Sequence, residues 1–211
     1  MEVETSERRG RGRPKTIDRD HVIDVAMDCY WREGTDAVSL NELCRRAGVS
    51  KPALYREFGG EDGLMDATLE HYAETVLAPM LERTTEDDSF ADVLASIVDV
   101  MVDLDRGMPP GCLLAKMRVL SSRLGAATQT RTDNLRVEAR ARYADWVERA
   151  KKRGEIAPDI PTPLAAAFID NQFTALLIQI ALGEDPDMLR AQARLTFAGL
   201  TSRAGTTDVS V

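Results

Sequence analysis

Basic side chains and a Ser-Lys pair are the groups in this sequence whose types and spacing suit chemistry with an anion. Six Lys and Arg residues lie between positions 8 and 19, opposed by one Asp, and Ser50-Lys51 stands where a short helix is predicted to begin. Guanidinium and ammonium groups placed in this way neutralise phosphate, whatever the net charge of the whole chain. These residues favour phosphate binding over catalysis.

Catalytic and metal-binding groups are poorly supplied. The sequence has two histidines, and its three cysteines, Cys29, Cys44 and Cys112, are far apart. This spacing fits neither paired disulfides nor a zinc site. The region 84–203 contains no histidine, no HExxH, no nucleophile elbow and no glycine-rich phosphate loop. We therefore expect no catalytic residue, no metal site and no cofactor, and we expect that the protein is not an enzyme.

The composition is that of a folded protein with one large domain, or with one small domain joined to a larger one. Of 211 residues, 44% are hydrophobic and 29% are charged, which disfavours disorder, collagen and a disulfide scaffold. The longest apolar run, Leu164 to Ile169, is far short of the ~20 residues that span a bilayer. The first residues are acidic and lack the apolar segment of a signal peptide. We expect a cytoplasmic protein.

The charge is distributed unevenly. Residues 1–60 contain eleven Lys and Arg and eleven Asp and Glu, so the net charge of −8 belongs to the rest of the chain. The basic cluster between positions 8 and 19 therefore stands out locally. It is either a solvated tail or a segment that binds an anion.

Helical periodicity with fitting caps begins at Ile17. Asp18 suits the N-cap of a first helix that ends at Gly34. The stretch 39–42 (SLNE) has the form of a capping box, in which the Ser hydroxyl accepts from the Glu amide and the Glu carboxylate returns to the Ser amide. The second helix stops at Gly48. A third helix begins after Ser50 and ends at Gly59-Gly60.

Further apolar repeats predict an all-α protein, because no segment alternates as a strand would. We expect about nine helices in total, with the boundary between two units inside the fourth. The six helices expected after the first three span 61–83 with a break near Pro79, 89–107, 112–124, 130–153, 164–182 and 186–203.

The second and third helices, joined by Gly48-Val49, form a helix-turn-helix pattern. In such a motif the first residues of the second helix face the major groove. Lys51 suits phosphate or guanine, and Tyr55 offers a hydroxyl to phosphate and a ring to a sugar or a thymine methyl. A helical hairpin that merely packs is the alternative. The residues expected to face DNA are Ser50, Lys51, Pro52, Ala53, Tyr55 and Arg56.

The segment 34–72, GTDAVSLNELCRRAGVSKPALYREFGGEDGLMDATLEHY, resembles the DNA-binding domain of the TetR family of bacterial transcriptional repressors, most of all in AGVSKPALYREF. The similarity covers about residues 17–72. It implies a homodimer that binds a palindromic operator and is released by a small ligand in the C-terminal domain. By position, Ser39 and Leu40 begin the first helix of the motif. The family often has Ser-Lys where this chain has Gly60-Glu61, and Glu61 would repel phosphate.

Beside this motif, the stretch 10–14 (GRGRP) is interpreted as a DNA-contacting arm. Its glycines let the backbone lie deep in a narrow minor groove, which Arg11 and Arg13 enter, with Lys15 adjacent. The expected organisation is therefore a flexible basic arm over 1–16, a helix-turn-helix domain over 17–72, and a ligand-binding and dimerisation domain over 73–205.

Candidate ligand-binding residues lie in the last of these domains. Cys112 follows Pro110-Gly111 and resembles a cysteine in one branch of the family; it is a sensor thiol whose pKa a helix N-terminus lowers, or a small buried hydrophobe. Asn171 and Gln172 either orient a ligand or bond across a dimer interface. His71 either lines the cavity or faces solvent. The expected lining of a largely apolar pocket is Met101, Cys112, Met117, Trp146, Phe168, Asn171, Gln172 and Phe173.

The leading hypothesis is a ligand-responsive repressor that is a homodimer through its last two helices. The helix over 164–182 is too apolar to face water, and the last helix adds an apolar stripe. An α-helical enzyme and a protein-binding adaptor with a basic arm are the alternatives. The stripe of the last helix consists of Leu189, Leu195, Phe197 and Leu200.

Overall fold

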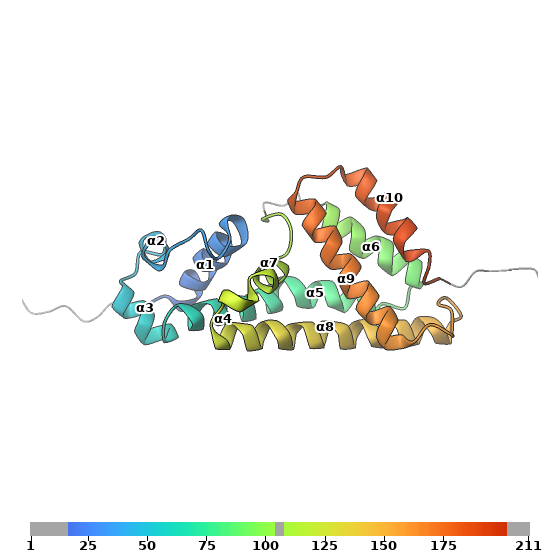
Figure 1. Cartoon of the computed structure of the whole chain (residues 1–211), viewed down its shortest axis with the longest axis horizontal. Coiled ribbons are helices and arrows are strands. Elements are labelled where there is room, and N and C mark those ends of the chain that lie inside the picture. The colour runs from blue at the N-terminus through green and yellow to red at the C-terminus, as the bar shows by residue number, and fades with distance from the viewer. Residues whose placement is uncertain (1–16, 104–107, 202–211) are drawn as a thin grey trace, which may run out of the picture.

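The computed structural model describes residues 17–103 and 108–201, and the first three helices form a compact group at one end (Figure 1). They are α1 (Arg19–Glu33), α2 (Leu40–Arg46) and α3 (Lys51–Phe58). Their N-caps are the predicted ones, since the side chains of Asp18, Ser39 and Ser50 each accept a hydrogen bond from the backbone amide three residues ahead. The expected residues Arg11, Arg13 and Lys15 lie outside the described residues.

The fourth predicted helix is one continuous helical segment with a change of type inside it. It comprises α4 (Glu61–Tyr72), a π-helical turn η1 (Ala73–Leu77) and α5 (Ala78–Glu82), followed by a 3-10 turn η2 (Arg83–Thr85). Pro79 lies in the first turn of α5, where its missing N–H is tolerated. The expected break near Pro79 is thus a change to π-helical bonding just before it.

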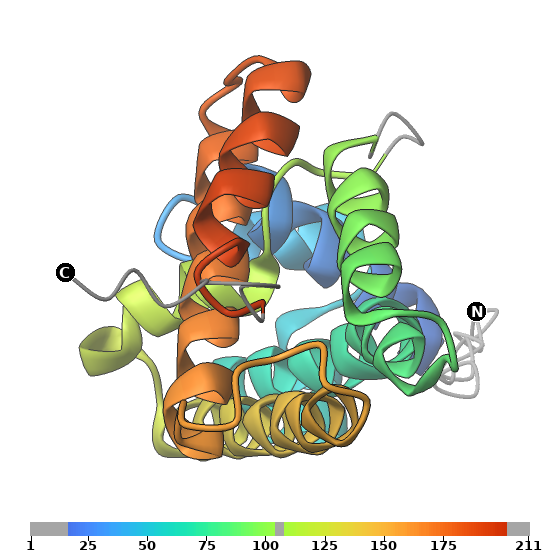
Figure 2. The same ribbon diagram turned by 90° about the vertical axis from the view of Figure 1, so that its right-hand side faces the viewer.

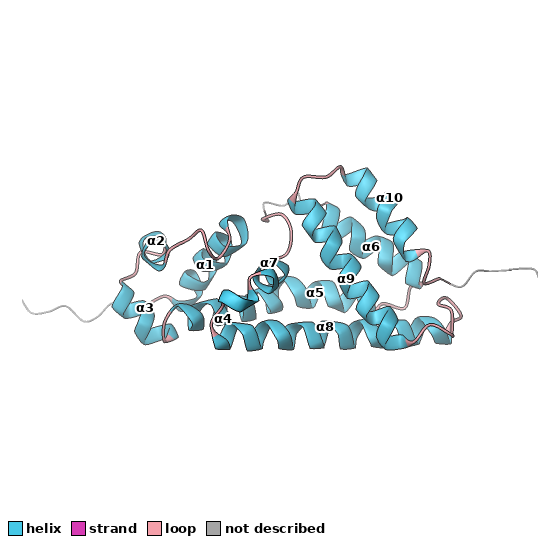
Figure 3. Cartoon of the chain, in the orientation of Figure 1, coloured by secondary structure: helices cyan, strands magenta, loops and turns pink. Residues whose placement is uncertain are grey.

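The C-terminal part consists of five α-helices. They are α6 (Phe90–Val102), α7 (Leu113–Val119) with a 3-10 turn η3 (Ser121–Arg123), α8 (Ala126–Lys152), α9 (Thr162–Ala181) and α10 (Pro186–Phe197). If the segment from α4 to α5 counts as one, the described part of the chain has nine α-helices. In that part the only β-type pairing is an isolated bridge between Ile156 and Thr201 (Figure 3).

The long helix α8 is the base on which the other elements lie. It runs beneath α4 and α5 and continues under α9, so that it contacts α4 near its start and α9 near its end (Figure 1). Seen from the side, α9 and α10 stand next to each other, and α6 faces them (Figure 2). One apolar core joins α1–α4 to α7, and a second joins α6, α8, α9 and α10.

Four predicted helix boundaries are wrong, and one of them is the end of α6, which lies at Val102 and not at 107. The helix expected over 112–124 ends at Val119 and continues as η3, and α10 ends at Phe197 and not at 203. Helix α8 begins at Ala126, four residues before the predicted start, because a side chain of α4 caps it. No local signal in the sequence of α8 announces that cap.

Helix α9 is also long and apolar enough, by length and composition alone, to cross a membrane. Its mean hydropathy is 1.4, although 33% of that window is buried in this chain. The buried side packs on α8 and α10, as expected of the core helix of a folded domain. The remaining face of α9 is exposed in the single chain.

Candidate nucleic-acid interface

The turn between α2 and α3 has the geometry of a helix-turn-helix. Gly48 adopts a positive φ of 66°, and the amide of Val49 then bonds back to the carbonyl of Cys44, which closes the C-terminal end of α2. The Ser50 hydroxyl accepts from the Ala53 amide at 3.3 Å and starts α3. Leu54 is fully buried and Phe58 packs against the same core. The turn sets where α3 begins, and the packing of Leu54 and Phe58 in the core determines which side of α3 faces outward.

That outer face presents most of the residues predicted to meet DNA. Lys51, Pro52, Tyr55 and Arg56 are exposed, with Tyr55 at 47%, while Ala53 is partly buried. The ammonium of Lys51 lies 6.0 Å from the centroid of the Tyr55 ring. A cation and an aromatic hydroxyl thus stand side by side on one exposed turn, which suits contact with phosphates and base edges.

Helix α2 differs from expectation in two respects. The Leu40 side chain is 7% exposed, so it packs in the core and is not part of the outer face, whereas Ser39 is exposed. The capping box is only half formed, because the Glu42 carboxylate accepts hydrogen bonds from Arg45 and Arg46. These bonds lower the pKa of Glu42 to about 2.

The start of α4 is held close to the end of α3. A Cβ on Gly63 would lie 1.8 Å from the carbonyl oxygen of Phe58, so only glycine allows this approach. Glu61 is exposed in the first turn of α4. The structure therefore leaves a carboxylate where the family often has a lysine.

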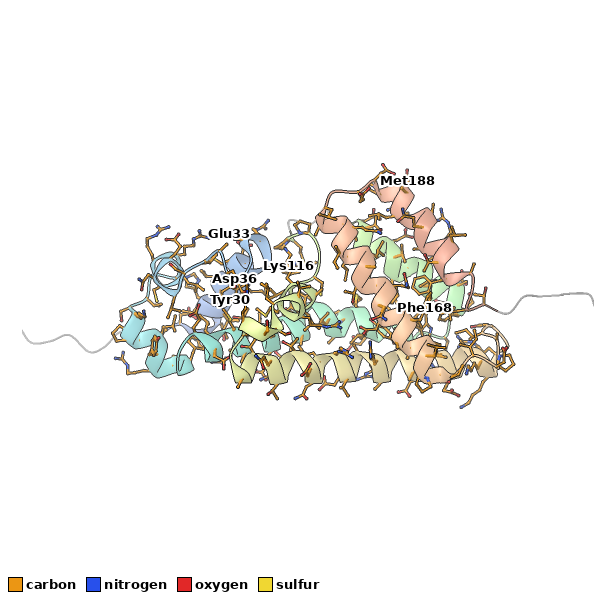
Figure 4. All side chains as sticks on the ribbon, viewed as in Figure 1. Tyr30, Glu33, Asp36, Lys116, Phe168 and Met188 are labelled. Atoms are coloured by element: carbon orange, nitrogen blue, oxygen red, sulfur yellow. The ribbon has the colours of Figure 1, made fainter. Side chains whose placement is uncertain are left out.

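Several side chains join the helix-turn-helix domain to the rest of the chain. The indole of Trp31 on α1 donates to the carbonyl of Gly111 at 3.2 Å, and Lys116 on α7 donates back to the carbonyl of Trp31. Figure 4 shows Lys116 at this junction, near Asp36, which pairs with Arg123 at 2.8 Å. Sequence patterns do not reveal these residues, since contacts between α1 and α7 leave no periodic signal.

A second junction connects α4 to the N-terminus of α8. The Asp62 carboxylate accepts from the amides of Ala127 and Thr128 at 3.0 and 3.1 Å and from the Thr128 hydroxyl at 2.6 Å. Burial raises the pKa of Asp62, but these hydrogen bonds outweigh it and lower the pKa overall. One turn later, Arg131 pairs with Asp66 and Glu70. Helix α4 therefore cannot tilt without disturbing α8.

An apolar cavity of about 250 Å³ lies where the two parts of the chain meet. Trp31 of α1 and Tyr72 of α4 form one side, and they contact each other edge to face with centroids 4.9 Å apart. Met80, Met101 and other side chains of α5 and α6 form the opposite side. A neighbouring cavity of about 40 Å³ lies deeper in the C-terminal part, between α5, α7, α8 and α9.

The predicted ligand-binding residues do not gather in one place. Met101 lines the apolar cavity, Cys112 and Phe173 line the small one, and Gln172 lines another small cavity between α9 and α10. The others line none of these cavities: Met117 and Trp146 are fully buried, Phe168 packs edge to face on Phe197, and Asn171 is exposed.

The geometry of Cys112 favours a small buried hydrophobe over a sensor thiol. The residue is 7% exposed, and its thiol caps α7 by accepting from the Ala115 amide and also accepts from the Tyr72 hydroxyl at 3.3 Å. Burial raises the pKa of the Cys112 thiol, so the expected lowering by a helix N-terminus is outweighed. Cys29 and Cys44 are buried in the core as expected. His71 pairs with Asp24 of α1 at 3.1 Å, away from the cavities.

A buried ion pair between α8 and α9 was not predicted from the sequence. Asp170 of α9 is 8% exposed and accepts from Arg140 of α8 at 2.8 Å. An Asp inside an otherwise apolar helical stretch is the signal that could have revealed it. In the described residues, no group of three or more His, Cys, Asp or Glu side chains is placed to hold a metal ion.

With this geometry established, comparison with known proteins identifies the class. Residues 22–68 match the model of the family described as bacterial regulatory proteins, tetR family. The chain is 29% identical to the HTH-type transcriptional repressor ComR of Escherichia coli (strain K12), over 93% of this chain and 92% of that protein. It is 24% identical to the HTH-type transcriptional repressor Rv1474c of Mycobacterium tuberculosis, over 82% and 87%.

Solved structures share the fold over nearly the whole chain. A cysteine mutant of the TetR family transcriptional regulator CifR, complexed with 26-base-pair operator DNA, matches with a TM-score of 0.76 at 23% identity and covers 90% of this chain and 100% of that one. The fold and the exposed face of α3 define a helix-turn-helix protein that binds double-stranded DNA. Residues 22–68 therefore form a DNA-binding domain of the TetR family, and the chain as a whole is similar to regulators of that family.

Proposed function

We propose that this protein is a cytoplasmic repressor that binds a palindromic operator as a homodimer and is released by a small, largely apolar ligand. The observation that carries the proposal is the apolar cavity of about 250 Å³, because its lining belongs to both domains. A ligand between Trp31 and Met101 touches the DNA-binding domain and α6 at once. Its binding energy is therefore available to change the position of α1 and α4.

The proposed dimer interface is the exposed face of α9 with that of α10. Leu164 and Ile178 are exposed on α9 and Leu182 is exposed at its C-cap, and the three follow one face at helical spacing. On α10 the expected stripe is not available, because Leu189, Phe197 and Leu200 are buried inside the chain; Met188 and Leu195 are exposed there. Asn171 is exposed on α9 midway between Leu164 and Ile178 at the same spacing, which favours its role in a dimer interface.

The test is selection of bound sequences from random duplex DNA by the full-length protein. We expect an enriched palindrome whose binding weakens as salt rises, and loss of enrichment in Tyr55→Ala. Compounds that fill the cavity are then found by release of the selected duplex. Binding without sequence preference would favour the adaptor, and turnover of a compound without release of DNA would favour the enzyme.

A further inference from the structure

The largest cavity described in the C-terminal part has a mixed polar and apolar lining, and it has no role in the proposed function. Its volume is about 430 Å³, and it lies between α7, η3, α8 and α9. It shares no lining residue with the apolar cavity, although Ala115, Arg118 and Thr174 also border the small cavity of about 40 Å³. Two arginines, two serines and a few small apolar side chains shape it: Ala115, Arg118, Val119, Ser121, Ser122 and Arg136.

In the described C-terminal part, every partly buried Lys or Arg side chain has a hydrogen-bond acceptor or an ion-pair partner in the chain, except the two that line this cavity. Nine Lys and Arg side chains are partly buried in the described residues from 73 onward. Seven of them have an acceptor in the chain: Arg83, Lys116, Arg131, Arg140, Arg149, Lys151 and Arg190. The two that form no hydrogen bond or ion pair with the described residues are Arg118 and Arg136, and both line the cavity.

The single carboxylate that lines the cavity does not pair with either arginine. Asp133 borders the cavity but is exposed, and it forms no ion pair with Arg136, one helical turn away. Desolvation of a lone charge is costly, so a guanidinium that has lost part of its hydration gains from an acceptor. A guanidinium presents a planar fork that matches a carboxylate. An anion from outside the chain would supply the acceptor that the described residues do not give these two arginines.

We propose that this cavity binds a small organic acid, with its carboxylate on Arg118 and Arg136. The hydroxyls of Ser121 and Ser122 are exposed at the same cavity and supply further donors, while Ala115 and Val119 offer apolar contact to the body of the ligand. The volume falls within the range of cavities that hold small molecules. This site goes beyond the proposed function, because the apolar effector occupies a different cavity.

Binding is measured by calorimetry and by thermal shift on the full-length protein in buffer free of other carboxylates. The probes are acetate, benzoate, succinate and citrate, with benzamide as the uncharged analogue of benzoate and inorganic phosphate as a simple anion. We expect at least one carboxylate to bind and to raise the melting temperature, and benzamide to do neither. Arg118→Gln and Arg136→Gln should each weaken its Kd about tenfold or more.

The matched control is Arg142→Gln, which removes an exposed arginine of α8 that does not line the cavity. It should leave the Kd unchanged. Without ligand, the double variant should melt at or above the wild-type temperature, since the arginines have no partner to lose. That result separates a ligand site from a structural role, in which the variants would melt lower.

Three outcomes would overturn the proposal. The wild type does not respond to any of the carboxylates, or Arg142→Gln weakens binding as much as the cavity variants do. The third outcome is that the Arg118→Gln and Arg136→Gln variants dissociate the dimer and that no anion binds to the wild type. That result would mean that a carboxylate of the partner subunit fills the cavity. All these readouts use protein without DNA, so failure of the proposed operator binding would not affect them.

Discussion

At the scale of the residue, the predicted DNA-binding chemistry centres on Tyr55, which lies on an exposed turn of α3. Lys51 lies beside its ring, and Leu54, next to it in sequence, is fully buried and anchors α3. Local caps and apolar spacing predict this division between a buried and an exposed face. The same reasoning misplaces Leu40, because a position in the first turn of α2 does not reveal which way its side chain points.

The first prediction concerns Tyr55 and Lys51. Replacing either by alanine should weaken operator binding by ~1–3 kcal/mol for each base that the side chain reads, and should change which half-site is preferred. Band-shift titrations against the selected operator and single-base variants measure both effects. Arg142→Ala, an exposed substitution on α8 outside the proposed dimer interface, is the control and should bind as the wild type does. Equal weakening on all sequences would mean that these side chains contact only phosphate.

A second residue-scale prediction follows from the buried pair of Tyr72 and Cys112. Burial raises the pKa of both groups above their ordinary values of 10.0 and 9.0. The folded state therefore keeps protons that the unfolded state releases. The stability from this pair is complete below about pH 9 and is lost as pH rises through the folded-state values.

Denaturant unfolding between pH 7 and pH 10 tests this expectation. The wild type should lose more free energy of unfolding over that range than Cys112→Ala, which lacks one of the two groups. Val98→Ala, a buried substitution that removes no titratable group, is the control. A thiol that reacts with iodoacetamide at pH 7 as fast as a free cysteine would contradict the buried, protonated Cys112.

At the scale of the element, the cap of α8 comes from another helix. The carboxylate of Asp62 accepts three hydrogen bonds from Ala127 and Thr128, and a Cβ on Gly125 would lie 2.2 Å from its carboxyl carbon. The sequence reveals a helix cap when the capping side chain lies within four residues of the backbone amide that it binds, as at Ser39 and Ser50. It does not show a cap that is 65 and 66 residues away from the amides it binds, so the predicted start of α8 is four residues late.

The third prediction is that Asp62→Ala destabilises the protein by ~0.5–2 kcal/mol at neutral pH, the usual cost of removing an N-cap. The folded pKa of Asp62 is lowered, so this stability is present above the ordinary value of 3.8 and is lost as pH falls through the folded value. Denaturant unfolding at pH 7 and at lower pH measures the difference. Asp145→Ala, on α8 and away from this cap, is the control and should change stability little.

Other elements show where prediction from sequence stops. Helix existence and type follow from apolar spacing and from breakers such as the prolines between 158 and 163. The π-helical turn Ala73–Leu77 and the end of α10 at Phe197 depend on tertiary packing, which local patterns do not contain. The same is true of the cavities, because five of the eight expected lining residues pack elsewhere than in the two cavities that border α5, α6 and α7.

At the scale of the whole molecule, the charge asymmetry sets how the protein approaches DNA. The net charge of −8 belongs to the chain beyond residue 60, so a polyanion is repelled by most of the surface. Attraction depends on local cations, of which Lys51 and Arg56 are exposed on α3. The basic segment before α1 lies outside the described residues, and its contribution is tested by mutation.

The fourth prediction is that replacing Arg11 and Arg13 by alanine reduces the salt dependence of binding. Removal of one phosphate contact lowers the slope of log affinity against log salt by ~0.9, so the slope of the double variant should fall by up to ~1.8 per subunit. The major-groove preference should persist, with a weaker A·T preference in the flanks. Titrations at several salt concentrations measure the slope, and an unchanged slope would mean that the arm does not touch DNA.

The fifth prediction concerns the exposed apolar face of α9 and α10. Leu182 and Leu195 are 75% and 79% exposed in the single chain. Contact of these large apolar side chains with water is unfavourable, and a second copy of the chain would cover them. Leu182→Glu and Leu195→Glu place charges in the proposed interface and should convert the dimer to a folded monomer near 23.3 kDa by light scattering. Val137→Glu, on α8 and 68% exposed, should leave the dimer intact.

Operator binding should fall together with dimerisation in these variants. A monomer contacts one half-site, and a palindrome gains its affinity from two half-sites bound at once. A variant that is monomeric yet binds the full palindrome as tightly as the wild type would contradict the two-fold arrangement. If Val137→Glu alone produced monomers, the interface would lie on α8, and the exposed apolar stripe of α9 would need another partner.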